Sequence, residues 1–161
     1  MSIFLNERRA KQLISFEGME RRWGLLPTDI DGYVEYIQKL YIFFEGKVVG
    51  TDLPEGQRRA LESICESHHN PYATGITDYN RFVFVLIFEH NTNPDDIIMM
   101  KDQIVVNVYN NISVEWRAPS AYDVIPKFIL NSEGKITVLN ALRQIEDWCH
   151  KNKIIIGKEK E

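Results

Sequence analysis

Residues 81–90, RFVFVLIFEH, are the run of side chains in this sequence that most strongly favours a β-strand. The run is apolar almost throughout, which is typical of a strand buried on both faces. A helix capped by Asp52 and reaching His68 is predicted before it, and another buried strand is predicted over residues 40–44. A strand, a helix and a second strand in this order form a β-α-β crossover, so the two strands should pair in parallel. The sequence therefore predicts an α/β fold with a mixed sheet flanked by helices.

The stretch from Pro27 to Lys47 is predicted to form two consecutive strands joined by a tight turn. The second of these strands contains the apolar run 40–44 and carries Glu45 and Lys47 directly after it. Because side chains alternate across a strand, Glu45 and Lys47 should point to the same face of the sheet.

Asp29 and Asp31 likewise share one face of the preceding strand. If the two strands pair antiparallel, an aspartate on one meets Glu45 and Lys47 on the other. Two carboxylates beside an ammonium group form a hard-oxygen site that suits Mg²⁺. Asp31 is the preferred ligand, because Gly32 follows it, as expected where a strand bends at a site.

The tripeptide Glu-Gly-Lys occurs twice, at residues 45–47 and again at 133–135. The second copy lies in a predicted turn, so the three letters alone are weak evidence of catalysis. The first copy follows a buried strand and precedes a helix on which Gln57, four residues before Leu61, should face the sheet and reach the site. Arg58 should point more outward.

A helix is predicted from Asn6 to about Arg22, with an apolar stripe that continues to Glu17 and Glu20. Two interpretations remain open: an exposed helix end with solvated charges, or a carboxylate directed at the site. Basic side chains are densest here, which makes the helix the best candidate for contact with phosphates. The candidate DNA-binding residues are Arg8, Arg9, Arg21, Arg22 and Arg58.

These residues, in this order, resemble the PD-(D/E)XK nuclease superfamily, which includes type II restriction enzymes and archaeal Holliday-junction resolvases. The matching residues are Pro27, Asp29 or Asp31, Glu45-Gly46-Lys47 and Gln57. The resemblance implies a restriction-endonuclease-like α-β-β-β-α-β core, here about residues 6–90. In that family the two acids bind Mg²⁺, for which Mn²⁺ can substitute, and the lysine positions or activates water. A first-helix glutamate completes the metal ligands in resolvase-like members, and Glu20 is favoured over Glu17 for this position.

Four short segments also look like a group of small phage and prophage proteins of this superfamily. They are residues 18–21, 27–32, 44–47 and 56–62. The resemblance implies a chain that acts in the cytoplasm of a bacterial host. Residues 91–155 match nothing in the family; strands are predicted at 103–109 and 113–117 and a helix at about 135–151.

Length and composition agree with one globular domain over residues 1–161. The chain has 44% hydrophobic and 26% charged residues and a net charge of −4, which argues mildly against non-specific coating of nucleic acid. No apolar run is long enough to span a bilayer, and no signal-peptide pattern opens the chain, so no membrane partner is expected. No phosphate-binding glycine loop or dinucleotide motif predicts a nucleotide cofactor.

Other chemistry-bearing residues have simpler interpretations. His68 and His69 lack a second ligand pair at zinc spacing. Tyr109 and Trp116 could stack a base, but packing is the commoner use of such side chains. The two cysteines, Cys65 and Cys149, are expected to be reduced thiols in helices.

The expected function is that of a magnesium-dependent DNA endonuclease, of junction-resolving or repair type. Asp31, Glu45 and the Gly46 carbonyl would hold the metal, Lys47 would stabilise charge on the phosphate, and Gln57 would orient water or the lysine. A homodimer is expected, because symmetric substrates suit twofold partners. The alternative is a catalytically inactive protein of the same fold that acts by binding, as a phage accessory or inhibitor. Action on RNA ranks below action on DNA.

Overall fold

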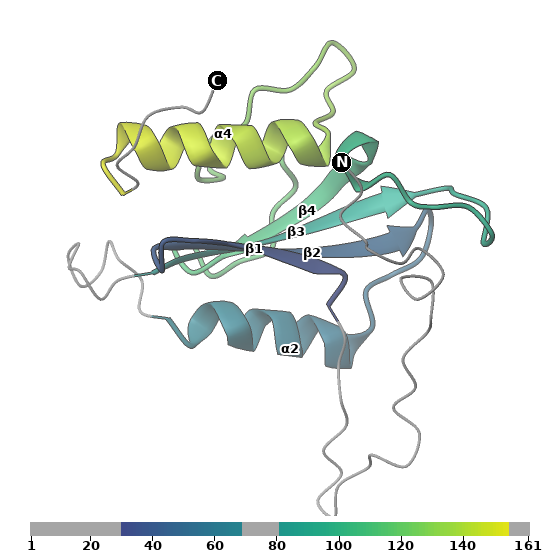
Figure 1. Ribbon diagram of the computed structural model, residues 1–161, viewed down its shortest axis with the longest axis horizontal. Helices are drawn as coiled ribbons and strands as arrows, with labels where there is room; N and C mark the ends of the chain where they lie inside the picture. Colours follow the sequence, from purple (N-terminus) through teal and green to yellow (C-terminus); the bar gives the residue numbers. More distant parts are fainter. Residues whose placement is uncertain (1–29, 69–80, 155–161) are drawn as a thin grey trace, which may run out of the picture.

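The computed structural model describes residues 30–68 and 81–154, and these form a mixed sheet with a helix on each face (Figure 1). The strands are β1 (Gly32–Tyr36), β2 (Leu40–Val48), β3 (Phe82–His90) and β4 (Ile104–Asn110). The helices are α2 (Glu55–Glu66), α4 (Val138–Lys151) and the short 3₁₀ helix η1 (Met100–Asp102). The sheet order is β1-β2-β3-β4.

The pairing of the strands agrees with the predicted β-α-β crossover. β2 and β3 are parallel neighbours in the middle of the sheet, while β1 pairs antiparallel with β2 and β4 pairs antiparallel with β3. The first seven residues of β3 are all buried, which confirms the prediction of a strand covered on both faces. The α/β class and the mixed, helix-flanked sheet are therefore confirmed.

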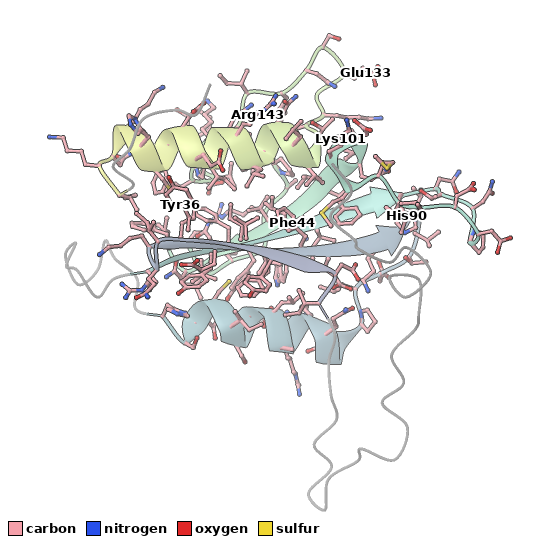
Figure 2. The ribbon with its side chains drawn as sticks, in the orientation of Figure 1. Tyr36, Phe44, His90, Lys101, Glu133 and Arg143 are labelled. Carbon is pink, nitrogen blue, oxygen red and sulfur yellow. The ribbon has the colours of Figure 1, made fainter. Side chains whose placement is uncertain are left out.

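Two apolar clusters fill the two faces of the sheet. Alternate side chains of β2 and β3, including Phe44 and Phe88, pack with α4, and Figure 2 shows Phe44 in the layer between the sheet and this helix. The intervening β3 side chains, such as Val85 and Ile87, pack with Leu61 of α2. The sheet thus separates two hydrophobic cores, one under each helix. Alternate side chains of a strand pack against α2 or against α4.

The structure differs from several sequence predictions at the edges of elements. Two strands are described between residue 30 and α2, whereas the resemblance implies three, so the restriction-endonuclease-like core is not established. The residue that caps α2 is Pro54, without a side-chain hydrogen bond, and Asp52 lies before it in the β2–α2 connection. Residues 113–117 form no strand; the backbone of Arg117 makes one isolated bridge with Val108 of β4.

α4 begins three residues later than predicted, because Thr137 caps it. The Thr137 hydroxyl accepts a hydrogen bond from the Asn140 amide at 3.2 Å, which satisfies one free N–H of the first turn. Among the described residues, no helix has the length and apolarity needed to cross a bilayer.

Replacing Thr137 with alanine (T137A) is expected to lower the free energy of unfolding by about 1 kcal/mol, because the amide of Asn140 loses its partner. Urea unfolding followed by circular dichroism measures the change. Thr137→Ser keeps the hydroxyl and should cost clearly less. Equal losses in the two variants would show that the hydroxyl does not cap the helix.

Candidate functional site

Glu45 and Lys47 lie on the α2 face of the sheet, and the alternation of β2 explains why. Leu40, Ile42 and Phe44 belong to the cluster that packs with α4. Successive side chains point to opposite faces, so Glu45 and Lys47 turn toward α2 instead. The structure therefore confirms the prediction that Glu45 and Lys47 point to the same face of the sheet.

Asp31 lies one residue before β1, beside the end of β2 that carries the tripeptide. Gly32 pairs with Phe44 in the antiparallel register, so the next position outward places Asp31 across from Glu45. The Asp31 Oδ2 atom accepts a hydrogen bond from the backbone N–H of Gly46 at 2.6 Å. The two strands thus bring the preferred aspartate to the Glu-Gly-Lys tripeptide, as the sequence predicts.

Gln57 joins the acid and the lysine. The Lys47 Nζ atom donates to Gln57 Oε1 at 2.6 Å and lies 3.0 Å from Glu45 Oε1. The Gln57 Nε2 atom donates in turn to the same Glu45 oxygen. Because Gln57 sits in the first turn of α2, the orientation of this helix fixes the relative positions of the ammonium and the carboxylate.

Glu45 is a buried carboxylate with one unpaired oxygen. The residue is 3% exposed, and its Oε2 atom has no hydrogen-bond partner within the described residues. Burial raises the pKa of Glu45, and the hydrogen bond from Lys47 opposes this rise only in part, while the negative charge of Asp31 adds to it. A buried anion with a free oxygen is costly for a folded chain, and a cation bound at that oxygen would relieve the cost.

The raised pKa of Glu45 gives a prediction for the metal-free protein. The Glu45 carboxyl keeps its proton to a higher pH in the folded chain than in the unfolded chain, where its pKa is about 4.5. The stability that the protonated carboxyl contributes is therefore present below pH 4.5 and is lost as the pH rises through the folded pKa. In EDTA, Glu45→Gln should therefore have a higher free energy of unfolding than the unmodified chain at neutral pH, and the gain should vanish near pH 4. Urea unfolding across this range tests it. Glu133→Gln, at an exposed glutamate, is the matched control, and a gain that persists at pH 4 would contradict the assignment.

Gly46 is constrained by the neighbouring strand. It pairs with Phe88 of β3, and a Cβ atom at Gly46 would lie 2.6 Å and 2.7 Å from two atoms of the Phe88 ring. Phe88 is buried in the α4 cluster, so the ring cannot move aside easily. The middle residue of this tripeptide therefore has to be glycine for a steric reason that the sequence did not reveal.

The donors fit a hard divalent cation in kind. The carboxylates of Asp31 and Glu45 and the carbonyl of Gly46 are oxygen ligands, and the unpaired Glu45 oxygen is the observation that supports a cation there. Within residues 30–68 and 81–154, no three His, Cys, Asp or Glu side chains lie together as a metal-ligand group. The predicted ligand Glu20, its alternative Glu17 and the alternative Asp29 lie outside the described residues.

Of the predicted DNA-binding residues, Arg58 is the one that the structure describes. Its guanidinium pairs with Glu55 at 2.7 Å and with Glu62 at 2.6 Å, both on its own helix. Three N–H groups of the guanidinium donate to these carboxylates, whose negative charges offset the positive charge that a phosphate would meet. Arg8, Arg9, Arg21 and Arg22 lie outside the described part of the chain.

The other chemistry-bearing residues have structural roles. The Trp116 Nε1 atom donates to Glu62 at 2.7 Å, and the Tyr109 hydroxyl donates to Glu66 at 2.6 Å. Both rings are thereby tied to α2, in agreement with packing and not with base stacking. His68 lies in contact with Tyr41, and both cysteines are free and buried, as predicted.

One neighbour of the site was not singled out in the sequence. Glu89 pairs with Lys47 in the parallel register of β2 and β3, so the two side chains lie side by side on the α2 face. Its signal was a charged residue near the end of an otherwise apolar run, but only the register shows which residue it faces.

Comparison of the chain with family models, with curated proteins and with solved structures gave no match.

Proposed function

We propose that this chain is a metal-dependent nuclease that hydrolyses phosphodiester bonds of DNA. The observation that carries the proposal is the meeting of Asp31, Glu45, Lys47 and Gln57 at one end of the sheet, with one oxygen of the buried Glu45 left unpaired. Structural ion pairs are usually satisfied, so an unpaired buried carboxylate oxygen points to a ligand.

Each residue has a part in this proposal. Asp31, Glu45 and the Gly46 carbonyl would hold Mg²⁺, with Mn²⁺ as a substitute. The ion, when bound, supplies Lewis-acid polarisation of the phosphodiester. Lys47 places a positive charge where negative charge builds on the phosphate, and Gln57 holds the Lys47 ammonium in place through the 2.6 Å hydrogen bond.

The finer parts of the proposal rest on the resemblance to PD-(D/E)XK nucleases. They are a restriction-endonuclease-like core, cleavage of junction-resolving or repair type, a homodimer, and action in the bacterial cytoplasm. A twofold dimer would present two such sites to a symmetric DNA substrate.

One observation favours the alternative of an inactive binding protein. Arg58 is paired with Glu55 and Glu62, so two carboxylates of its own helix offset the positive charge predicted to contact a phosphate. A protein that keeps the fold and binds another protein would not need that charge for DNA.

Incubation of labelled DNA with the full chain separates the two functions. Linear, nicked, single-stranded and four-way-junction DNA would be tested with Mg²⁺ or Mn²⁺, in parallel with EDTA. Metal-dependent cutting that is lost in Asp31→Asn supports the nuclease and identifies its substrate. A folded chain that cuts none of these forms contradicts the nuclease, and calorimetric titration with Mn²⁺ then shows whether the site binds metal at all.

A further inference from the structure

A small pocket adjoins Lys47 on the α2 face of the sheet. Its volume is about 180 Å³, and the residues that line it include Lys47, Asp52, Leu53, Ile87, Glu89 and Asn107. They come from the end of β2, the β2–α2 connection, β3 and β4, so elements distant in sequence build it. No residue of α2 (Glu55–Glu66) lines the pocket.

Strand register explains why these side chains face the same space. Lys47 pairs with Glu89 across β2 and β3, and Ile87 pairs with Asn107 across β3 and β4. Ile87 belongs to the cluster under α2, and Glu89, two residues later, points to the same face. Glu89 itself pairs with Ile104, because the register of β3 and β4 shifts between Ile87 and Phe88. Lys47, Glu89 and Asn107 therefore face the same side of the sheet beside the candidate site, although Glu89 and Asn107 are not directly opposite each other.

The chemistry of the pocket favours a base over a phosphate. Its floor is apolar, from the buried Ile87 and the half-buried Leu53. Its polar wall carries the carboxylates of Asp52 and Glu89, which would repel a phosphate, while the Lys47 ammonium at the edge of the pocket is engaged by Gln57 and Glu45. Within the described residues, the Glu89 carboxylate makes no ion pair and the Asn107 Nδ2 atom has no acceptor, while Asn107 Oδ1 is used by the Val108 amide at 3.1 Å. The Glu89 carboxylate, an acceptor, and the Asn107 Nδ2 group, a donor, line the same pocket and are therefore available to a ligand.

Size limits the ligand further. Pockets for drug-sized molecules measure about 300–1,000 Å³, and a pocket of about 180 Å³ suits a single small ring system. Glutamate accepts from the amino group of cytosine, and asparagine pairs with adenine, whereas thymine presents an acceptor oxygen at the corresponding position. A carboxylate facing that oxygen would be repulsive.

We propose that this pocket receives the nucleobase next to the bond that is cut, and that Glu89 and Asn107 select cytosine or adenine, by the amino group at C4 or C6, over thymine, which has an oxygen at C4. This inference rests on the proposed function, because it places the base beside Lys47 and the phosphate at Asp31 and Glu45. A base enters such a pocket only when it is unpaired, so the inference also predicts a preference for DNA with unpaired nucleotides near the cut.

The test separates base binding from cleavage. Methyl resonances of Ile87 and Leu53 in the full chain would be followed by NMR in EDTA, during titration with dCMP, dAMP, dTMP or inorganic phosphate. We expect dCMP and dAMP to shift both resonances, and dTMP and phosphate to leave them unchanged. Glu89→Gln and Asn107→Ala should each weaken dCMP binding at least about fivefold, while Glu133→Gln, at an exposed turn, should leave it unchanged.

A cleavage series on single-stranded DNA that varies the base beside the cut completes the experiment. Base-specific NMR shifts without cleavage would keep the pocket and overturn the nuclease. Cleavage that is indifferent to the base, with no shifts or with equal shifts from dTMP or phosphate, would overturn the pocket and leave the nuclease standing. Both variants lie on the half-buried rim of the sheet, and unchanged far-ultraviolet circular dichroism would show that they fold.

Discussion

Lys47→Ala is expected to slow the metal-dependent cleavage of DNA about a hundredfold to a thousandfold, because the phosphate loses the positive charge fixed beside it. The hydrogen bond from Lys47 to Gln57 at 2.6 Å and its 3.0 Å approach to Glu45 are lost together. Single-turnover cleavage rates at saturating metal measure the effect. Binding of Mn²⁺ should persist, because Asp31 and Glu45 are unchanged.

The second Glu-Gly-Lys tripeptide supplies a matched control within the same chain. Lys135 also stands two residues after a glutamate, but the pair is 3.8 Å apart and largely exposed, in the turn before α4. Lys135→Ala removes the same charge and should leave the cleavage rate within about twofold of the unmodified chain, because an exposed charge of this kind contributes little. Equal losses in the two variants would mean that overall charge matters and not the position of Lys47.

Gly46→Ala is expected to lower the free energy of unfolding by about 1–3 kcal/mol, because the added methyl group overpacks the interior. The Cβ atom would meet the Phe88 ring at 2.6–2.7 Å and lie 3.3 Å from Asp31 Oδ2. The strand would have to move, and with it the N–H of Gly46 that holds Asp31. Cleavage should therefore fall as well, and urea unfolding together with cleavage rates tests both effects.

Two further variants isolate the steric cause. As a single change, Phe88→Leu should lower the free energy of unfolding by about 1–2 kcal/mol. It also removes the ring atoms that a methyl group added at Gly46 would meet. The double variant G46A/F88L should therefore lose less than the sum of the single losses. Gly56→Ala, in α2 with no atom near its Cβ position, should be neutral or slightly stabilising. Additive losses in the double variant would show that the ring is not the obstacle.

The local hydrophobic pattern of the sequence predicted the elements in which that pattern is clearest. The continuous apolar run of β3, the β-α-β crossover and the alternation that places Glu45 beside Lys47 all follow from side-chain period, and the structure shows each of them. Asp31 could be placed as well, because antiparallel pairing and the following Gly32 are both local signals. Gln57 followed from its helical spacing to Leu61.

Features that depend on three-dimensional neighbours could not be predicted. The contact of Gly46 with Phe88 and the pairing of Lys47 with Glu89 depend on strand register, which no single segment encodes. The helix start at Glu55 instead of just after Asp52, and the single bridge at Arg117 in place of a strand, reflect competition between local propensity and packing. The third strand and the metal ligand Glu20 remain predictions from the resemblance.

The packing of Gly46 against Phe88 bears on whether this site could be grafted onto another protein. Glu45 and Lys47 face one core, while the residue between them is held against the opposite core by a ring from the next strand. A scaffold that received only the tripeptide, the aspartate and the glutamine would lack the packing of Phe88 against Gly46. A transplant would also have to carry the adjacent parallel strand with its phenylalanine, so the smallest portable unit includes the strand pair β2–β3 and not only a set of site side chains.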